Sequence, residues 1–432
     1  MIKEKTPKNH VKLSKNIVEY IIKEIIIKLF PNTTYKYSSD TKNQKQVLAQ
    51  INNRPTDKGI LCDDGGRFEF NRAQQFSKTE SSIIENILSI ASGYSSLDEN
   101  QQKYLVLNTM SQVIAKHLSD VSEILDSSQL ARMIDKLEHW AHETYEGQSI
   151  SVAFSINTNK TTNNLSKENT LTFENFSKED FSKVLSNGHD TLVELTSEYK
   201  FLDYKVLSLN MSSLNSPFRY STYAKYTNNN KCIVFVLNRN SELLIFNSGK
   251  LSFAKRRGDW RFFSEHITRQ MRFKARGKVA QEDLFLSIYA SILDVSFART
   301  GACIGVINSK EITNFRDSKL VKKEDYLSSS KQIKSTLLNH IVNEKPFHKL
   351  DRRIRQELLS IDGSLILNAK GDVLAVGAIL QIQINEDTYH SHATGGARLA
   401  AAKALSEFGV SFKVSTDGEV TVLSKEELFI FG

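Results

Sequence analysis

The feature of this sequence that most constrains its fold is a short apolar segment, residues 302–307, that directly follows a predicted helix. Apolar residues recur at helical spacing over 281–300, so we expect a helix there that ends at Gly301. The segment after the glycine reads Ala-Cys-Ile-Gly-Val-Ile, carries no charge, and suits a strand buried at the centre of a sheet. A helix, a glycine and a buried strand in succession are typical of an α/β domain.

The rest of the C-terminal third continues this alternation of helices and strands. We expect a helix that ends near 359, a hairpin of strands 364–367 and 373–380, a polar loop, a helix over 397–408 and a closing hairpin over 410–423. The predicted fold class is therefore α/β, with a mixed central sheet flanked by helices.

One motif at a helix start indicates an anion site. Thr394, Gly395 and Gly396 precede a helix that begins at Ala397, and Arg398 lies in its first turn. Unpaired backbone N–H groups and the helix dipole favour an anion at such a position, and glycines let a phosphate approach the backbone. Arginine adds a fork of donors that matches phosphate oxygens. An ordinary helix start can show the same pattern, so both interpretations stay open.

The second motif is Asp362 followed by Gly363 and Ser364 at the start of a strand. A carboxylate there could hold Mg²⁺ or Mn²⁺ against a triphosphate and assist deprotonation of an attacking hydroxyl. An Asp-Gly pair is more often simply a turn. The occurrence of both motifs within one compact α/β unit favours a phosphate site with a nearby acid.

These motifs resemble those of diadenylate cyclase domains. Residues 362–364 are similar to the Asp-Gly-Ala motif of that family, and residues 396–407 are similar to its Gly-Thr-Arg-His-Arg-Ala-Ala segment with a following Leu-Ser-Glu. Order and spacing agree over about 280–425. The resemblance implies a domain that condenses two ATP molecules, with Mg²⁺ or Mn²⁺ and across a face-to-face pair of domains, to cyclic di-AMP and pyrophosphate.

The resemblance also implies roles for individual residues. Asp362 would be the metal-linked catalytic acid, and Arg398 would be the phosphate-binding arginine of the reaction. The other nucleotide-binding positions would be those that shape the pocket around these two, namely Gly363, Ser364, Thr394, Gly395, Gly396 and Ala397. The face-to-face arrangement implies a homodimer or a higher oligomer.

The chain departs from the family pattern at three positions. Ser364 replaces an alanine, which is a mild change, whereas Leu399 and Ala400 stand where the family has His-Arg. Loss of one preorganised electrostatic contact lowers a catalysed rate by about 10²–10³-fold. The pattern is similar to a divergent branch of these domains suggested to sense nucleotides in bacterial signalling or defence. We therefore expect a sensor of ATP or a cyclic dinucleotide, with an active diadenylate cyclase as the alternative; whether the chain is an enzyme stays open.

The chain divides by sequence texture into three regions. Residues 1–145 are expected to be mainly helical, 146–280 β-rich, and 281–432 the diadenylate-cyclase-like core. In the first region we expect a helix from about Ser14 to Phe30. In the second, the β runs on either side of residues 239–241 predict a hairpin.

Composition and charge restrict the partners. The net charge of +8 favours anionic ligands, nucleic acid or acidic surfaces, although a solvated surface explains it equally well. Three widely spaced cysteines predict neither a disulfide framework nor a metal cluster, so a cytoplasmic location is the natural expectation. A membrane span needs about 20 mostly apolar residues. The Ile-rich run near residue 20 is broken by charges, so we expect no membrane span.

Three further segments carry candidate chemistry. Nine Lys and Arg residues against two Asp and Glu occupy 251–278, so this stretch could contact ATP or, less strongly, nucleic acid, with Trp260 as a stacking platform. A solvated hairpin rim with a half-buried Trp260 explains it too. His390 and His392 could bind a transition metal, although two imidazoles alone are a weak pattern. The Asp-Asp-Gly-Gly segment at 63–66 is expected to be a turn within a short hairpin.

Overall fold

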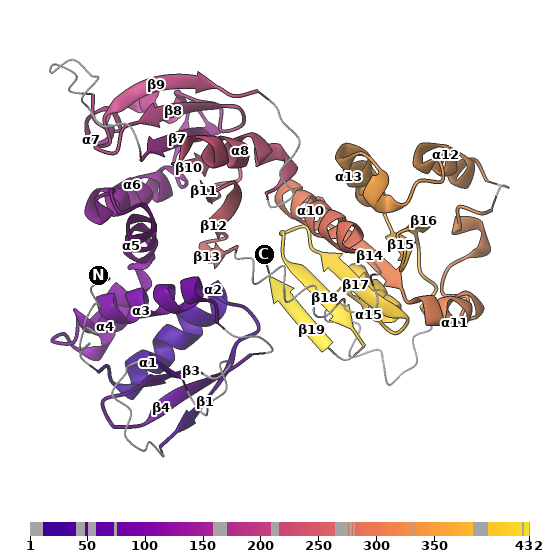
Figure 1. The fold of residues 1–432 in the computed structure, drawn as a ribbon, viewed down its shortest axis with the longest axis horizontal. Helices are drawn as coiled ribbons and strands as arrows, with labels where there is room; N and C mark the ends of the chain where they lie inside the picture. The colour runs from indigo at the N-terminus through magenta and orange to yellow at the C-terminus, as the bar shows by residue number, and fades with distance from the viewer. Residues whose placement is uncertain are drawn as a thin grey trace, which may run out of the picture. The chain divides into compact units, whose positions relative to one another are not determined.

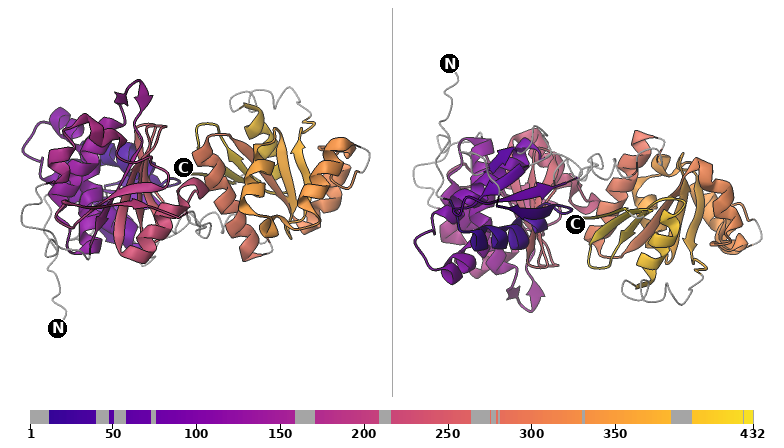
Figure 2. Two further views of the ribbon diagram at one scale, coloured as in Figure 1. Left: turned by 90° about the horizontal axis from the view of Figure 1, so that it is seen from above. Right: turned by 90° about the horizontal axis from the view of Figure 1, so that it is seen from below.

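The structure, a computed structural model, describes residues 12–39, 48–50, 58–72, 76–158, 171–208, 216–263, 275, 279, 281–329, 332–382, 396–425 and 427–431. The chain forms two compact units, which are described separately (Figures 1 and 2). The first unit comprises Met1–Asn210 with Thr222–Phe263, and the second comprises Met211–Ser221 with Ser264–Gly432.

The first unit begins with the helix expected over 14–30, which is confirmed. Ser14 caps it, because its side chain accepts a hydrogen bond from the backbone N–H of Ile17. The helix is continuous but contains one turn of π-helix, so it consists of α1 (Lys15–Ile21), the π segment η1 (Ile22–Ile26) and α2 (Ile27–Leu29). Its apolar stripe is buried, as the spacing of its isoleucines predicts.

A four-stranded antiparallel sheet and four helices follow in the first unit. The sheet has the order β1-β4-β3-β2, with β1 (Thr34–Ser38), β2 (Leu48–Gln50), β3 (Lys58–Leu61) and β4 (Arg67–Asn71). The turn expected at 63–66 joins β3 to β4. The helices are α3 (Lys78–Ser92), α4 (Glu99–Leu107), α5 (Met110–Ser122) and α6 (Ser127–Trp140). Ser77, Asp98 and Asp126 cap three of them through side-chain bonds to backbone N–H groups.

The range expected to be β-rich forms a seven-stranded sheet of order β13-β12-β11-β10-β7-β8-β9. Its strands are β7 (Val152–Asn157), β8 (Thr191–Leu195), β9 (Phe201–Val206), β10 (Cys232–Leu237), β11 (Leu243–Asn247), β12 (Lys250–Arg256) and β13 (Asp259–Phe262). The hairpin expected around 239–241 is the antiparallel pair β10 and β11. The short strands β5 (Thr144–Tyr145) and β6 (Gln148–Ser149) pair apart from this sheet. This range also contains helices, namely α7 (Phe173–Phe176), the 3-10 turn η3 (Asp180–Val184) and α8 (Ser221–Asn230).

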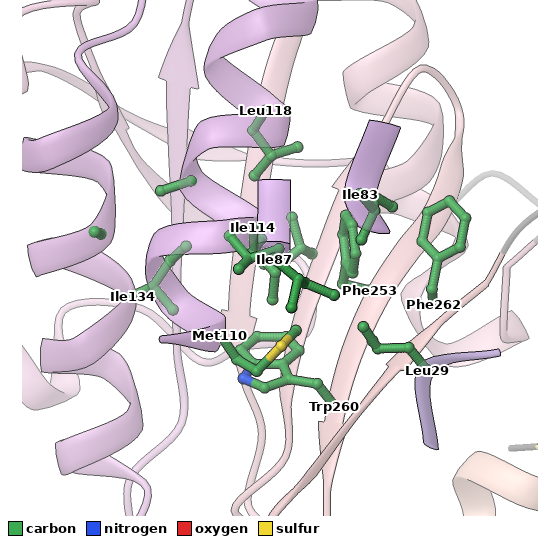
Figure 3. Packing of buried hydrophobic residues seen from close by; sticks show 14 of the residues in the cluster. Leu29, Ile83, Ile87, Met110, Ile114, Leu118, Ile134, Phe253, Trp260 and Phe262 are labelled. Carbon is green, nitrogen blue, oxygen red and sulfur yellow. The ribbon is translucent and has the colours of Figure 1, made fainter. Parts of the chain in front are cut away.

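One hydrophobic core joins the helices of the first unit to its larger sheet. Figure 3 shows part of it, where side chains of α3, α5 and α6 meet Phe253, Trp260 and Phe262 of β12 and β13. The cluster extends from Leu13 to Phe262. It therefore runs across residue 145, where the sequence suggested an end to a separate helical region.

The second unit contains a six-stranded sheet of order β16-β15-β14-β17-β18-β19. The strands are β14 (Ala302–Ile307), β15 (Ser364–Asn368), β16 (Val373–Ala378), β17 (Gly409–Val414), β18 (Val420–Ser424) and β19 (Glu427–Phe431). β14 and β15 are parallel, and all other neighbours are antiparallel. The helices are α10 (Glu282–Ala298), α11 (Ile312–Asp317), α12 (Ile333–Val342), α13 (Arg352–Ser360) and α15 (Gly396–Ser406). Short 3-10 turns are η4 (Phe218–Tyr220), η5 (Ser309–Glu311), η6 (Lys323–Asp325) and η7 (Phe347–Lys349).

Helices cover both faces of this sheet. Cys303 and Ile307 of β14 share a hydrophobic cluster with Ala402 and Leu405 of α15. Among the described residues, this cluster contains none from α10 or α13, although both helices contact strands of the sheet, so they cover the opposite face. The mixed central sheet flanked by helices is thus as expected. No helix within the described ranges is long and apolar enough to cross a bilayer.

Candidate functional site

The topology of the second sheet brings the two sequence motifs to the same edge. Because β14 and β15 are parallel, both begin at this edge, with Cys303 opposite Ser364. Asp362 and Gly363 directly precede β15 and therefore lie there as well. The helix α15 leads into β17, which begins at the other edge opposite Ile307. The N-terminus of α15, with Gly396, Ala397 and Arg398, consequently lies at the edge that contains Asp362.

A direct contact fixes the position of Arg398. A Cβ atom added to Gly301 would lie 2.7 Å from Arg398 Nη1 and 2.9 Å from Cζ, so the guanidinium lies against the glycine backbone just ahead of β14. Gly301 has a φ of +74°, which an L side chain rarely adopts. The helix α10 ends earlier than the sequence predicted, at Ala298 with Arg299 as its left-handed C-cap. Gly301 therefore follows the helix end, and it makes room for Arg398, a role that was not visible in the sequence.

Arg398 brings a positive charge to this edge. Its side chain is partly buried, and it makes no hydrogen bond or ion pair with any residue that the structure describes. Its charge still reaches the neighbouring strand, because it helps to lower the pKa of Cys303 against the larger effect of burial. The first N–H groups of α15 add partial positive charge at the same place. The combination favours an anion.

Cys303 and Ser364 lie side by side on β14 and β15, in the interior next to the Asp362 edge. Both are buried, and the serine side chain hydrogen-bonds the thiol. Burial raises the pKa of Cys303 to about 11, so the thiol stays protonated at neutral pH and is no nucleophile. The structure therefore places Ser364 beneath the site with its side chain turned inward.

Asp362 is exposed at the mouth of β15. Its Oδ1 accepts the backbone N–H of Gly363 at 3.1 Å, the geometry of an Asp-Gly turn. Gly363 has a φ of +108°, and a Cβ there would lie 2.5 Å from the carbonyl carbon of Gly377, so only glycine fits. Within the described ranges, no group of three or more metal-type side chains surrounds Asp362 or any other position. One carboxylate still suits Mg²⁺, which is commonly held by one or two carboxylates plus substrate phosphates.

A second cation lies close to Asp362, and sequence reasoning missed it. Lys334 of α12 donates to the carbonyl oxygen of Gly377 at 2.7 Å and pairs with Asp325 at 3.3 Å. A Cβ added to Gly377 would lie 3.4 Å from Lys334 Nζ and 2.9 Å from the carbonyl oxygen of Asp362. The lysine reaches the edge through the packing of α12. Its local sequence contains no turn, glycine pair or periodic pattern that points to the site.

Several expected residues lie outside the described part of the chain. Thr394 and Gly395 are among them, as are His390 and His392. Gly396 is described and has a φ of +71°, with open space where a Cβ would be. The structure therefore brings together Asp362, Gly363, Ser364, Gly396, Ala397 and Arg398, and it leaves the remaining predictions untested.

The basic stretch 251–278 is described only over 251–263 and at residue 275, and this part does not form the surface that its composition suggested. Trp260 is only 5% exposed, and its indole N–H donates to Glu138 at 2.9 Å. The stacking-platform interpretation is therefore wrong for this side chain, which belongs to the core. Lys255 pairs with the same glutamate at 2.7 Å, and Arg256 pairs with the buried Glu242 at 2.8 Å. These cations are neutralised from within the first unit.

Comparison with known proteins does not assign the chain to a family. No family model matches it, and no curated protein matches it. A solved structure of a hypothetical membrane spanning protein from Bacillus cereus matches at 15% identity and a TM-score of 0.28, over 38% of this chain and 70% of that one. DacA from Staphylococcus aureus, solved as a double mutant, matches at 18% identity and a TM-score of 0.22, over 34% of this chain and 85% of that one. Likenesses at these values carry no argument about function, so the resemblance drawn from the motifs stays a prediction.

Proposed function

We propose that the second unit binds a nucleotide through its phosphates at the Asp362 edge, and that the protein senses ATP or a cyclic dinucleotide. The observation that carries the proposal is Arg398. Its guanidinium lies at the start of α15 against Gly301, without a partner among the described residues. A partly buried, unpaired arginine beside a helix N-terminus is stabilised by a phosphate more than by water alone.

The strength of this contact can be bounded from general values. A hydrogen bond to a charged group contributes about 1.5–3 kcal/mol, which corresponds to roughly 10- to 150-fold in affinity. The N–H groups of α15 add a smaller share through the helix dipole, about 0.3–1 kcal/mol. Lys334 brings further positive charge to the same edge, although Asp325 neutralises part of it. A triphosphate or a cyclic dinucleotide presents enough anionic oxygens to use all three.

Two side chains favour a sensor over an enzyme. Leu399, which stands where related domains have a polar residue, packs against the hydrophobic cluster beneath α15. The buried hydroxyl of Ser364 hydrogen-bonds the thiol of Cys303. Neither contributes a charge or a donor to a reacting phosphate. Binding needs a net attraction only, whereas catalysis needs donors aimed at charge that develops in the transition state.

An active diadenylate cyclase is the second candidate, because Asp362 is exposed at the same edge as Arg398. Mg²⁺ or Mn²⁺ held by this carboxylate would neutralise the triphosphate and polarise its phosphorus–oxygen bonds. Asp362 would hold the ion, and Arg398 would orient the phosphates. Condensation of two ATP molecules would require a second copy of the chain, so this candidate predicts a homodimer or higher oligomer in the active state.

Purified protein incubated with ATP and Mn²⁺ distinguishes the two candidates when products are separated and identified by mass spectrometry. We expect no cyclic di-AMP, together with a rise in melting temperature on addition of ATP or cyclic di-AMP. Cyclic di-AMP that disappears in Asp362→Asn would refute the sensor-only form and establish the cyclase. Substitution of the acid by its amide keeps the size and the turn while removing the charge.

The matched control for Arg398→Ala is Arg353→Ala. Arg353 also lies in the first turn of a helix of the second unit, but it is exposed and pairs with its own N-cap residue Asp351. We expect the ligand-induced rise in melting temperature to be lost in Arg398→Ala and kept in Arg353→Ala. Equal rises in wild type and Arg398→Ala would overturn the proposed phosphate site.

A further inference from the structure

A second candidate binding site lies within the first unit, between α6 and α7. A cavity of about 200 Å³ is lined by one face of α6, by α7 and the two residues that follow it, and by Tyr199. The α6 face presents residues at positions i, i+3, i+4 and i+7, which are Gln129, Arg132, Met133 and Lys136. That spacing places all four side chains on one side of a helix. Nothing in the second unit is needed to form this cavity.

The floor of the cavity is apolar and firmly held. Met133, Phe173 and Tyr199 are each at most 5% exposed. The hydroxyl of Tyr199 donates to the backbone oxygen of Asp126 at 2.9 Å, which ties it to the N-cap of α6. Burial raises the pKa of Tyr199, so the phenol stays neutral. The floor can therefore accept an apolar body without bringing a charge against it.

The rim of the cavity is cationic. Arg132, Lys136 and Lys178 line it together with one acid, Glu174, which leaves two positive charges in excess. None of these four side chains makes a hydrogen bond or an ion pair with a described residue. Arg132 and Lys136 act on Asp126 and Glu143 through longer-range electrostatics, and Lys136 lies over the Trp140 ring at 5.7 Å. Like charges four residues apart on a helix repel each other. An anion placed between Arg132 and Lys136 removes that repulsion.

In the cavity beside Trp260, in the same unit, the lysines are already paired with carboxylates. This cavity measures about 350 Å³, and its two lysines are Lys28 and Lys255. Lys28 pairs with Asp259 at 3.2 Å, and Lys255 pairs with Glu138 at 2.7 Å. An anionic ligand would have to displace these carboxylates. Between α6 and α7, by contrast, no described carboxylate forms an ion pair with Arg132, Lys136 or Lys178, although Glu174 lies in the same rim.

The geometry points to a small phosphate monoester as the occupant, with a body the size of one ring. A cavity of about 150 Å³ lined by apolar side chains holds benzene in another protein, so 200 Å³ leaves room for one ring and little more. The ring would lie among Met133, Phe173 and Tyr199, where aromatic edges and the adaptable thioether suit it. The phosphate, a dianion above its second pKa of about 6, matches the two excess charges. Arg132 offers it a two-point fork.

Methyl NMR on the full chain tests this proposal, with phenyl phosphate as the probe at pH 8. The chain has five methionines, and Met133→Leu assigns the one methyl signal that lies in the cavity. We expect the Met133 signal to shift and saturate with phenyl phosphate. The double variant Arg132→Gln with Lys136→Gln should weaken this binding at least tenfold. A control variant, Lys225→Gln with Arg239→Gln, removes two cations outside the cavity and should bind as wild type does.

Three results would overturn the proposal. One is an unmoved Met133 signal up to millimolar phenyl phosphate. Another is an equal shift with inorganic phosphate or with benzyl alcohol, because the site requires both the anion and the ring. The third is unchanged affinity in the Arg132/Lys136 double variant whose free Met133 signal keeps its wild-type position, which shows that the cavity is still folded. None of these readouts depends on nucleotide binding at Arg398.

Discussion

Two regions of this molecule carry the sequence signature of an anion site, and they differ in how their charges are used. The β12–β13 hairpin is rich in arginine and lysine, yet Lys255 and Arg256 are paired with glutamates, and Trp260 is bonded to one of them. The edge at Asp362 has fewer cations, but Arg398 is left without a described partner. The number of charges in a segment therefore does not tell how many of them are available to a ligand. That depends on how each charge is paired in the folded state.

The largest expected effect is on the buried pair beneath the hairpin. Glu242 is fully buried and accepts from Arg256 at 2.8 Å and from Asn238 at 2.8 Å. Arg256→Met leaves this carboxylate buried and uncompensated, which should lower the free energy of unfolding by about 3–5 kcal/mol. Urea unfolding followed by tryptophan fluorescence measures it, because both tryptophans, Trp140 and Trp260, belong to the first unit.

The double variant Arg256→Met with Glu242→Leu tests the reason for that loss. It leaves no buried charge, so we expect it to be more stable than Arg256→Met alone. A double variant as unstable as the sum of the two single variants would mean that packing, rather than charge, holds this region together. The Arg256–Glu242 ion pair would then not be what stabilises the hairpin.

The next effect compares two glycines with left-handed backbones. Gly301 has a φ of +74° and no room for a Cβ beside Arg398, whereas Gly258 in the hairpin turn has a φ of +84° and open space. An alanine in this conformation costs about 1–2 kcal/mol from the backbone alone. We expect Gly258→Ala to lose that amount and Gly301→Ala to lose more, because it must also move the guanidinium.

Scanning calorimetry with and without ATP checks this pair. Gly301→Ala should lose the ATP-induced rise in melting temperature as well as stability, while Gly258→Ala should keep the rise. If Gly301→Ala keeps the full rise, the position of the guanidinium against the glycine is irrelevant to the ligand, and Arg398 binds it in some other way.

A pH effect is expected under the hairpin. His117 of α5 is buried, with its ring edge-on to Phe253 and Phe262, and burial lowers its pKa despite the opposing effect of Asp120. Below about pH 6.5, the usual pKa of histidine, His117 binds a proton in the unfolded chain more readily than in the folded chain. The free energy of unfolding should therefore be highest above pH 6.5 and fall as the pH drops, by at most about 1.4 kcal/mol per pH unit.

Unfolding of wild type and His117→Phe between pH 8 and pH 5 isolates this contribution, since other titrating groups affect both proteins alike. As the pH falls, the free energy of unfolding of wild type should decrease relative to that of the variant. A difference that is constant with pH would mean that His117 titrates normally in the folded state. The underside of the hairpin would then be open to water rather than sealed.

The sequence predicted elements well where the pattern is local. The π turn at Ile22–Ile26 escaped prediction, because it changes the hydrogen bonding without changing the apolar stripe. The helix α8 escaped because it is polar and has asparagines rather than a strong apolar period. At the site, Asp362 and Arg398 could be predicted from a turn pair and a helix start. Lys334 could not, because it is held by contacts with Gly377, 43 residues away in the chain.

Pairing was also beyond local prediction. Lys255 pairs with a glutamate 117 residues earlier, so nothing within the hairpin indicates that its charge is neutralised. Conversely, Arg398 resembles any arginine in a first helical turn until its surroundings are known. At the hairpin, sequence reasoning overestimated the number of available charges, since it weighs residue types without their distant partners. At the Asp362 edge its site residues stay a prediction.

The smallest expected effect on stability is the one that separates the two regions most sharply. Arg398→Ala removes a charge that has no described partner to leave behind, so the free energy of unfolding should change by less than about 0.5 kcal/mol. Arg353→Ala, the exposed first-turn arginine of α13, should change it as little. Calorimetry of the ligand-free proteins measures both.

If Arg398→Ala instead destabilises the protein by as much as Arg256→Met does, Arg398 is a structural cation like those of the hairpin. A residue kept for the fold would then explain the motif, and the case for a nucleotide at this edge would lose its main support. If stability is unchanged and the ATP-induced rise is lost, the arginine acts on the ligand rather than on the fold, because only the ligand-bound state has then lost a contact.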